Sequence, residues 1–70
     1  MQSHMSPYES LEYRESMLRH QLKDTLLDAA HVAHTDEPEA VMAKIAKAHN
    51  IAEKIRGVRN ELNEMRKTYG

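Results

Sequence analysis

Apolar residues recur along this chain at steps of three, four and seven, in two long segments separated by a short polar stretch. This spacing is typical of one face of an α-helix, and no segment alternates with the two-residue period of a strand. The pattern predicts an all-α protein with helices over about residues 7–34 and 37–68. The first apolar stripe comprises Leu11, Leu18, Leu22, Leu26, Ala29 and Ala33, and the second comprises Val41, Ile45, Ala48, Ala52, Ile55, Leu62 and Tyr69.

The two prolines stand where the helices are expected to begin. Ser6-Pro7-Tyr8-Glu9 is a capping box, in which the serine hydroxyl and the glutamate side chain each accept a hydrogen bond from a backbone N–H. Asp36 is the predicted cap of the second helix, with Pro38 in its first turn. A link of two or three residues between such helices forces an antiparallel hairpin.

In this hairpin, residues whose numbers add up to about 73 face each other, so that Leu18 lies opposite Ile55. Charge supports the same arrangement. The chain through Glu39 has a net charge of −5 and the remainder has +4. The two halves can therefore lie against each other, for example through an ion pair of Arg59 with Glu15 or Glu12.

Length and composition bound the architecture. Seventy residues make one small domain. Residues 1–4 are typical of a vector-derived remnant ahead of a second start methionine, so we assign the domain to residues 5–70. Without cysteine the chain has neither a disulfide nor a thiolate zinc site. No apolar run is long enough to span a membrane and no signal peptide is visible, so we expect a cytoplasmic protein.

One segment raises the question of a metal site. Asp28, His31 and His34 are spaced so that they share a helix face, and carboxylate and imidazole groups can bind zinc. However, histidines in the last turn of a helix also interact favourably with its negative end, and carboxylates favour the first turn of the next helix. We interpret the segment as a turn and predict no metal and no cofactor. Glycine-rich phosphate loops and activated nucleophiles are also missing, so we expect no enzyme.

The basic second half permits a nucleic-acid interface, because cationic and amide side chains on an exposed helix can contact phosphates and bases. Interleaved aromatic residues are lacking, and a solvated face that pairs with the acidic first helix is the simpler interpretation. The candidate residues of this alternative, a dimeric helical nucleic-acid-binding regulator, are Lys47, Lys54, Arg56, Arg59, Asn63, Arg66 and Lys67.

Apolar residues exceed what one helix–helix contact needs. A monomeric hairpin would expose much of this surplus, and exposed apolar patches usually mark protein interfaces. We therefore predict a homodimer that forms a four-helix bundle. The favoured function is a non-catalytic interaction module: a regulator, inhibitor or chaperone-like adaptor of a larger protein. The predicted partner-binding residues are Tyr13, Met17, Met42, Ile51, Val58 and Met65.

Overall fold

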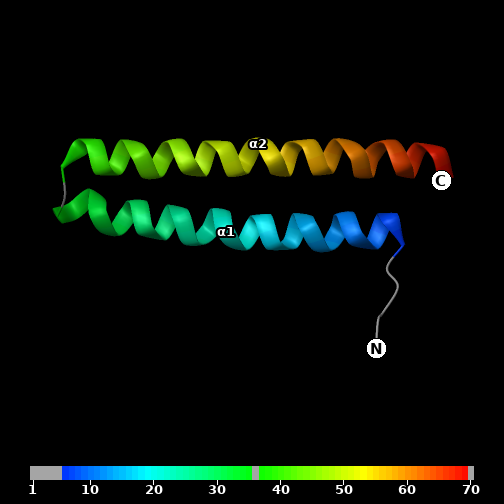
Figure 1. Cartoon of the computed structure of the whole chain (residues 1–70), viewed down its shortest axis with the longest axis horizontal. Helices are drawn as coiled ribbons and strands as arrows, with labels where there is room; N and C mark the ends of the chain where they lie inside the picture. Colours follow the sequence, from blue (N-terminus) through cyan, green and yellow to red (C-terminus); the bar gives the residue numbers. More distant parts are fainter. Residues whose placement is uncertain (1–5, 36, 70) are drawn as a thin grey trace, which may run out of the picture.

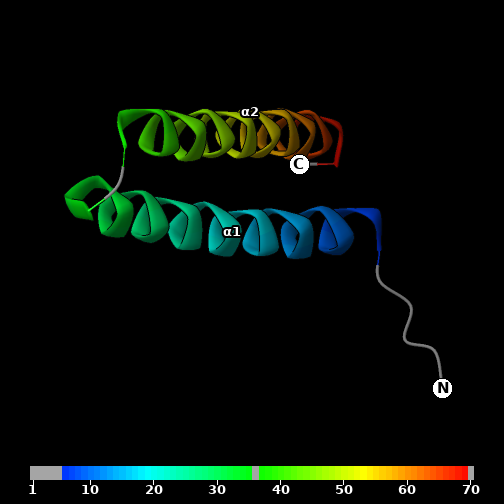
Figure 2. The ribbon, with the colours of Figure 1, turned by 60° about the vertical axis from the view of Figure 1, so that its left-hand side comes forward.

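The computed structural model describes residues 6–35 and 37–69, apart from the side chains of Thr35 and Tyr69. It consists of two helices, α1 (Pro7–Thr35) and α2 (Pro38–Tyr69). The helices lie side by side and run antiparallel (Figures 1 and 2). The predicted hairpin and its two helices are therefore confirmed to within one residue at each end. The predicted remnant at residues 1–4 and the predicted cap Asp36 lie outside the described residues.

Local interactions define both helix starts. The Ser6 N–H donates to Glu9 Oε1 at 3.0 Å and the Glu9 N–H donates to Ser6 Oγ at 3.1 Å, so the predicted capping box is confirmed. At α2, the Glu37 carbonyl accepts a hydrogen bond from the Ala40 N–H at 3.0 Å. This places Pro38 at the first helical position, where its missing N–H costs no hydrogen bond.

The contact between the helices follows a strict heptad pattern. In α1, the described side chains that are buried or half-buried alternate at steps of three and four, and α2 repeats the pattern with the single addition of Ala40. This spacing is that of a coiled-coil seam. The seam positions of α1 are Tyr8, Leu11, Glu15, Leu18, Leu22, Thr25, Ala29 and Val32. Those of α2 are Val41, Lys44, Ala48, Ile51, Ile55, Val58, Leu62 and Met65.

Polar pairs between the helices confirm the predicted register. Glu15 Oε2 lies 3.1 Å from Arg59 Nη1, which is one of the two ion pairs predicted for Arg59. At the turn end, Lys44 Nζ lies 3.0 Å from Asp28 Oδ2. At the open end, Arg66 Nη2 donates to the hydroxyl of Tyr8 at 3.0 Å. The residue numbers of the three pairs add up to 74, 72 and 74, which brackets the expected 73.

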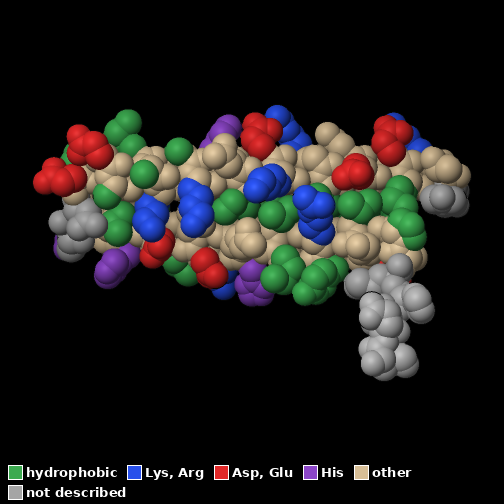
Figure 3. All heavy atoms as spheres, in the orientation of Figure 1, with side chains coloured by type: hydrophobic (Ala, Val, Ile, Leu, Met, Phe, Trp, Pro, Cys, Tyr) green, Lys and Arg blue, Asp and Glu red, His purple; other side chains and the backbone are tan. Residues whose placement is uncertain are grey.

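The core is thin and lies toward the open end of the hairpin. Its main cluster consists of Leu18, Ile51, Ile55, Val58 and Leu62, with Tyr8, Leu11 and Leu22 packed against it. Figure 3 shows apolar side chains running between the helices, with basic side chains lying across them. Toward the turn the buried residues are small. No described side chain is less than 2% exposed, so this core is partly open to solvent along its whole length.

Part of the predicted stripe is wrong. Leu26 and Ile45, expected in the seam, are 50% and 54% exposed, whereas Thr25 is 7% exposed and takes the seam position in α1. Ile51 and Val58, expected beside the seam, are 5% and 4% exposed and belong to the core. The strict repeat explains the difference, because a seam between two long helices keeps its step of three and four even where a polar residue falls on it.

Neither α1 nor α2, as far as the structure describes them, combines the length and apolar character that crossing a membrane requires.

Candidate protein interface

Large apolar side chains are exposed on both helices. Three of the predicted partner-binding residues are among them: Tyr13 is 58% exposed, Met17 43% and Met42 67%. Met65 is half-buried at the open end of the seam. Ile51 and Val58 are buried inside the hairpin, so their assignment to an outer surface is wrong. The predicted partner-binding set leaves out three exposed residues: Leu26 and Ile45, which were expected in the seam, and Leu27, which was expected beside it with Tyr13 and Met17.

One face of the hairpin is identified by the Glu15–Arg59 ion pair, and we call it the Glu15 face. Arg19 belongs to it, because its guanidinium binds the same carboxylate oxygen. Residues at steps of seven lie on the same side of a helix in a heptad seam. Counting by sevens from Arg19 and Arg59 therefore extends this face. It comprises Glu12, Arg19, Leu26 and Ala33 on α1, and Ile45, Ala52, Arg59 and Arg66 on α2.

The other face carries the Asp28–Lys44 ion pair, and we call it the Asp28 face. Gln21 lies on this face because it is seven residues before Asp28, and Lys47 lies beside Gln21 because the two residues line the same hollow of about 380 Å³. Steps of seven extend it in the same way, and between Pro7 and Ala40 at its ends the described flanking positions are polar. They are Arg14, Gln21 and Asp28 on α1, and Lys47, Lys54 and Glu61 on α2.

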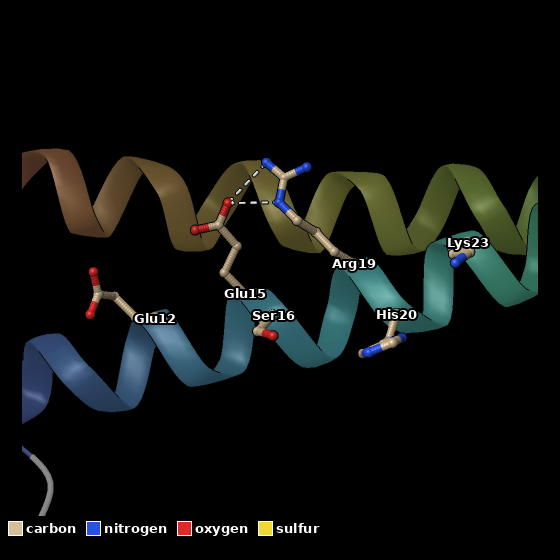
Figure 4. A pocket seen from close by; sticks show the side chains of 6 residues that line it. All are labelled: Glu12, Glu15, Ser16, Arg19, His20 and Lys23. Carbon is tan, nitrogen blue, oxygen red and sulfur yellow. Dashed lines mark hydrogen bonds and ion pairs between the residues drawn. The ribbon is translucent and has the colours of Figure 1, made fainter.

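Glu15 is the electrostatic centre of its face. Glu15 Oε2 accepts hydrogen bonds from Arg19 Nε at 3.0 Å and from Arg59 Nη1 at 3.1 Å, and the Glu15 side chain is only 15% exposed. The hydrogen bond from Arg19, joined by that from Arg59, lowers the pKa of the Glu15 carboxyl below its usual value despite partial burial. Figure 4 shows Glu15 and Arg19 pointing toward each other. The Glu15 carboxylate of α1 thus forms an ion pair with Arg59 of α2 and links the two helices.

Two open hollows lie along the outside of α1. One, of about 350 Å³, has leucine side chains at Leu22, Leu26 and Leu27 and cations at Arg19 and Lys23. The other, of about 540 Å³, is lined by residues of α1 alone: Glu12, Glu15, Ser16, Arg19, His20 and Lys23.

The second hollow contains a serine and a histidine one turn apart. A serine nucleophile needs a base within hydrogen-bonding distance, and the base needs a group that orients it. Figure 4 draws no hydrogen bond between Ser16 and His20, and His20 points away from the Glu15 carboxylate. The described residues of this hollow therefore do not assemble an activated nucleophile.

The weak metal candidates are not gathered into a site. The Asp28 carboxylate binds Lys44, whose hydrogen bond lowers the pKa of Asp28. His31 and His34 are exposed near the end of α1. Within the described residues, no group of three or more His, Cys, Asp or Glu side chains is arranged to hold a metal ion.

The seven candidate nucleic-acid residues are spread over different sides of α2. Lys47 and Lys54 lie on the Asp28 face, while Arg59 lies on the Glu15 face. Arg66 hydrogen-bonds to Tyr8 of α1, which raises the pKa of the Arg66 guanidinium. Two further cations pair within α2, Arg56 with Glu53 at 2.6 Å and Lys67 with Glu64 at 4.0 Å, and Asn63 is exposed.

Comparisons of this chain with protein-family models, with curated proteins and with solved structures find no match.

Proposed function

We propose that this chain is a small, non-catalytic protein–protein interaction module that acts in the cytoplasm as a homodimer. In this role it regulates, inhibits or adapts a larger protein. The observation that carries the proposal is the exposure of large apolar side chains, from 43% for Met17 to 67% for Met42, on both helices. Exposed apolar side chains that gather into a patch mark sites of association.

The weakness of the core supports self-association. A domain of this size rarely gains more than about 3–5 kcal/mol from its core without a staple. This hairpin has no cysteine and no described side chain below 2% exposure. Association with a second copy would bury further apolar surface and stabilise the fold by mass action.

Tyr13 and Met17 are the residues that we assign to the larger partner. They lie one helical turn apart in the open half of α1, outside the heptad stripes that define the Glu15 face. Tyrosine and methionine are both enriched at protein interfaces, and the flexible methionine side chain adapts to irregular surfaces. Together they form a compact apolar anchor that self-association through the Glu15 face would leave accessible.

A pull-down from source cells with nuclease-treated and untreated lysates tests this function. The tagged wild-type chain should retain a partner protein after nuclease treatment, and Tyr13→Gln combined with Met17→Gln should release it. Leu27→Gln is the matched control, because Leu27 is 59% exposed but lies elsewhere on α1. A partner retained equally by all three proteins would overturn the assignment of Tyr13 and Met17.

Sedimentation of the purified chain over a range of concentrations tests the homodimer. The melting temperature of the chain should also rise with protein concentration, because dimerisation stabilises the folded state. A monomer at every concentration would refute self-association. The nucleic-acid alternative gains no support from the structure, since its candidate residues are divided between two faces and several are paired. Loss of all captured protein on nuclease treatment would restore it.

A further inference from the structure

The Glu15 face is divided into two chemically different halves along its length. Near the turn its flanking residues are apolar: Leu26, Ala33, Ile45 and Ala52, with the half-buried Leu22 between the helices. Toward the open end it carries the ion pairs of Glu15 with Arg19 and Arg59. The Asp28 face has no such apolar half, because its described flanking residues are polar except for Pro7 and Ala40, the first residue and an early residue of the two helices.

This difference indicates on which side a second layer of helices can pack. Two helices that contact only each other need apolar residues at the seam positions alone. Helices that pack into a bundle carry an additional apolar flank beside the seam. Leu26 and Ile45 supply that flank on the Glu15 face, at 50% and 54% exposure. A polar flank on the Asp28 face suits contact with water.

We propose that a second copy of this chain packs on the Glu15 face with the turns of both hairpins at the same end of the dimer. The proposal rests on the homodimer put forward above and assigns its interface and orientation. A two-fold axis parallel to the helices places α1 of each copy against α2 of the other. The apolar half then meets the apolar half, with Leu26 of one copy beside the Ile45 and Ala52 stripe of the other.

The ionic halves match in the same arrangement. Each copy presents two carboxylates on α1, Glu12 and Glu15, and two guanidinium groups on α2, Arg59 and Arg66, with Arg19 beside the apolar half. Because the two-fold axis exchanges α1 and α2, the carboxylates of one copy approach the side of the second copy that carries Arg59 and Arg66. Charges of opposite sign therefore face each other at the open end.

The reverse orientation, with the turn of one copy over the open end of the other, lacks this match. It would place Leu26 and Ile45 against Arg19 and Arg59. The ion pairs of Glu15 would lose water against apolar side chains without gaining an oppositely charged group from the second copy, and this desolvation is unfavourable. The division of the face thus favours turns at the same end.

Distances between spin labels test the orientation. Because the chain has no cysteine, Glu39→Cys near the turn and Lys67→Cys at the open end each create a single labelling position. Both residues are exposed. In the proposed dimer, pulsed electron paramagnetic resonance should give distances below about 35 Å for either label, since only the width of a bundle of roughly 10–12 Å helices and the label arms separate the two labels.

Long distances contradict the proposal. With turns at opposite ends, both labels would lie about 40 Å or more apart, because the roughly 28 residues from Glu39 to Lys67 span about 42 Å at roughly 1.5 Å each. A dimer that overlaps only at the turns would give a short distance for Glu39→Cys and a long one for Lys67→Cys. Either result would overturn this orientation while leaving the homodimer intact. A wild-type chain that is monomeric throughout would overturn both.

Substitutions test the face independently of the labels. Leu26→Gln and Ile45→Gln should each raise the dimer dissociation constant by about tenfold or more, because each places an amide in the apolar contact. Met17→Gln is the control. It changes an apolar side chain of similar exposure, but one on the opposite side of α1 from Leu26, nine residues away at roughly 100° each. Helicity measured by circular dichroism verifies that each variant folds. Equal weakening by Leu26→Gln and Met17→Gln would show that the contact lies elsewhere.

Discussion

Leu18 and Met17 are adjacent in α1 but have opposite environments, and this makes a sharp test of the hairpin. Leu18 is 8% exposed and belongs to the main core cluster, whereas Met17 is 43% exposed. Replacing each with alanine removes a side chain of similar size. Leucine and methionine have similar helix propensities, so the change in propensity nearly cancels between the two variants. The difference in their stability therefore reports tertiary packing.

The expected magnitude follows from the burial. Truncation of a buried leucine to alanine costs about 2–5 kcal/mol, depending on how far the surroundings close the cavity. The Leu18 site lies in a two-helix contact that is partly open to solvent, so we expect a cost of about 2–3 kcal/mol. Met17→Ala removes a side chain that is already partly hydrated and lies outside the core cluster, and we expect a cost of at most about 1 kcal/mol.

Urea denaturation followed by circular dichroism, at one fixed protein concentration, measures both values. If Leu18→Ala proves too unstable to fit, Ile55→Val on the facing helix offers a milder probe, with an expected cost of about 0.5–1.5 kcal/mol. Equal losses for Leu18→Ala and Met17→Ala would refute the assignment of the seam.

Four further outcomes are expected. Ser6→Ala should cost about 1 kcal/mol in thermal or urea denaturation, because it leaves the Glu9 N–H without its capping partner; an unchanged midpoint would contradict the capping box. Gly57→Ala should stabilise the protein by about 1 kcal/mol, since an added methyl group at Gly57 meets nothing within 4 Å and alanine favours helix; destabilisation would mean that another backbone approaches there. The pKa of Glu15 lies below its usual 4.5, so its ion pairs stabilise the fold above that pH and are lost as the pH falls through the lower folded value. Between about pH 6 and about pH 2, the wild type should therefore lose more stability than Glu15→Gln, and parallel profiles would contradict the network. A chelator should leave the melting temperature unchanged, as the Asp28 carboxylate is held by Lys44, and a clear decrease would reinstate a metal site.

Local sequence patterns account for the helices and the register. The capping box at Ser6 and Glu9 depends on residues three apart, and the spacing of apolar residues identifies a helix without reference to the rest of the chain. A link too short to allow any other path then makes the helices antiparallel. The pairing of Glu15 with Arg59 follows directly from this register and from the opposite charges of the two halves.

The sequence alone did not determine which of two neighbouring rows of residues on each helix is buried between the helices. Leu26 was more apolar than Thr25, yet the structure buries Thr25 and exposes Leu26. The reason is that a continuous seam keeps steps of three and four over the whole helix. The register of all the other seam positions therefore places Thr25, and not Leu26, in the seam. In α2 the sequence did contain information about which row of residues is buried. Seven residues after Ala52 comes the charged Arg59, whereas seven residues after Ile51 comes the apolar Val58.

The candidate interface depended on that same decision. Once Ile51 and Val58 turn inward, Ile45 and Ala52 are left on the Glu15 face beside Leu26, and the apolar part of that face lies in the half of the hairpin near the turn. Individual side chains can be ranked as apolar from the sequence. Their grouping into one face arises from the relative rotation of two packed helices, which only the tertiary structure provides.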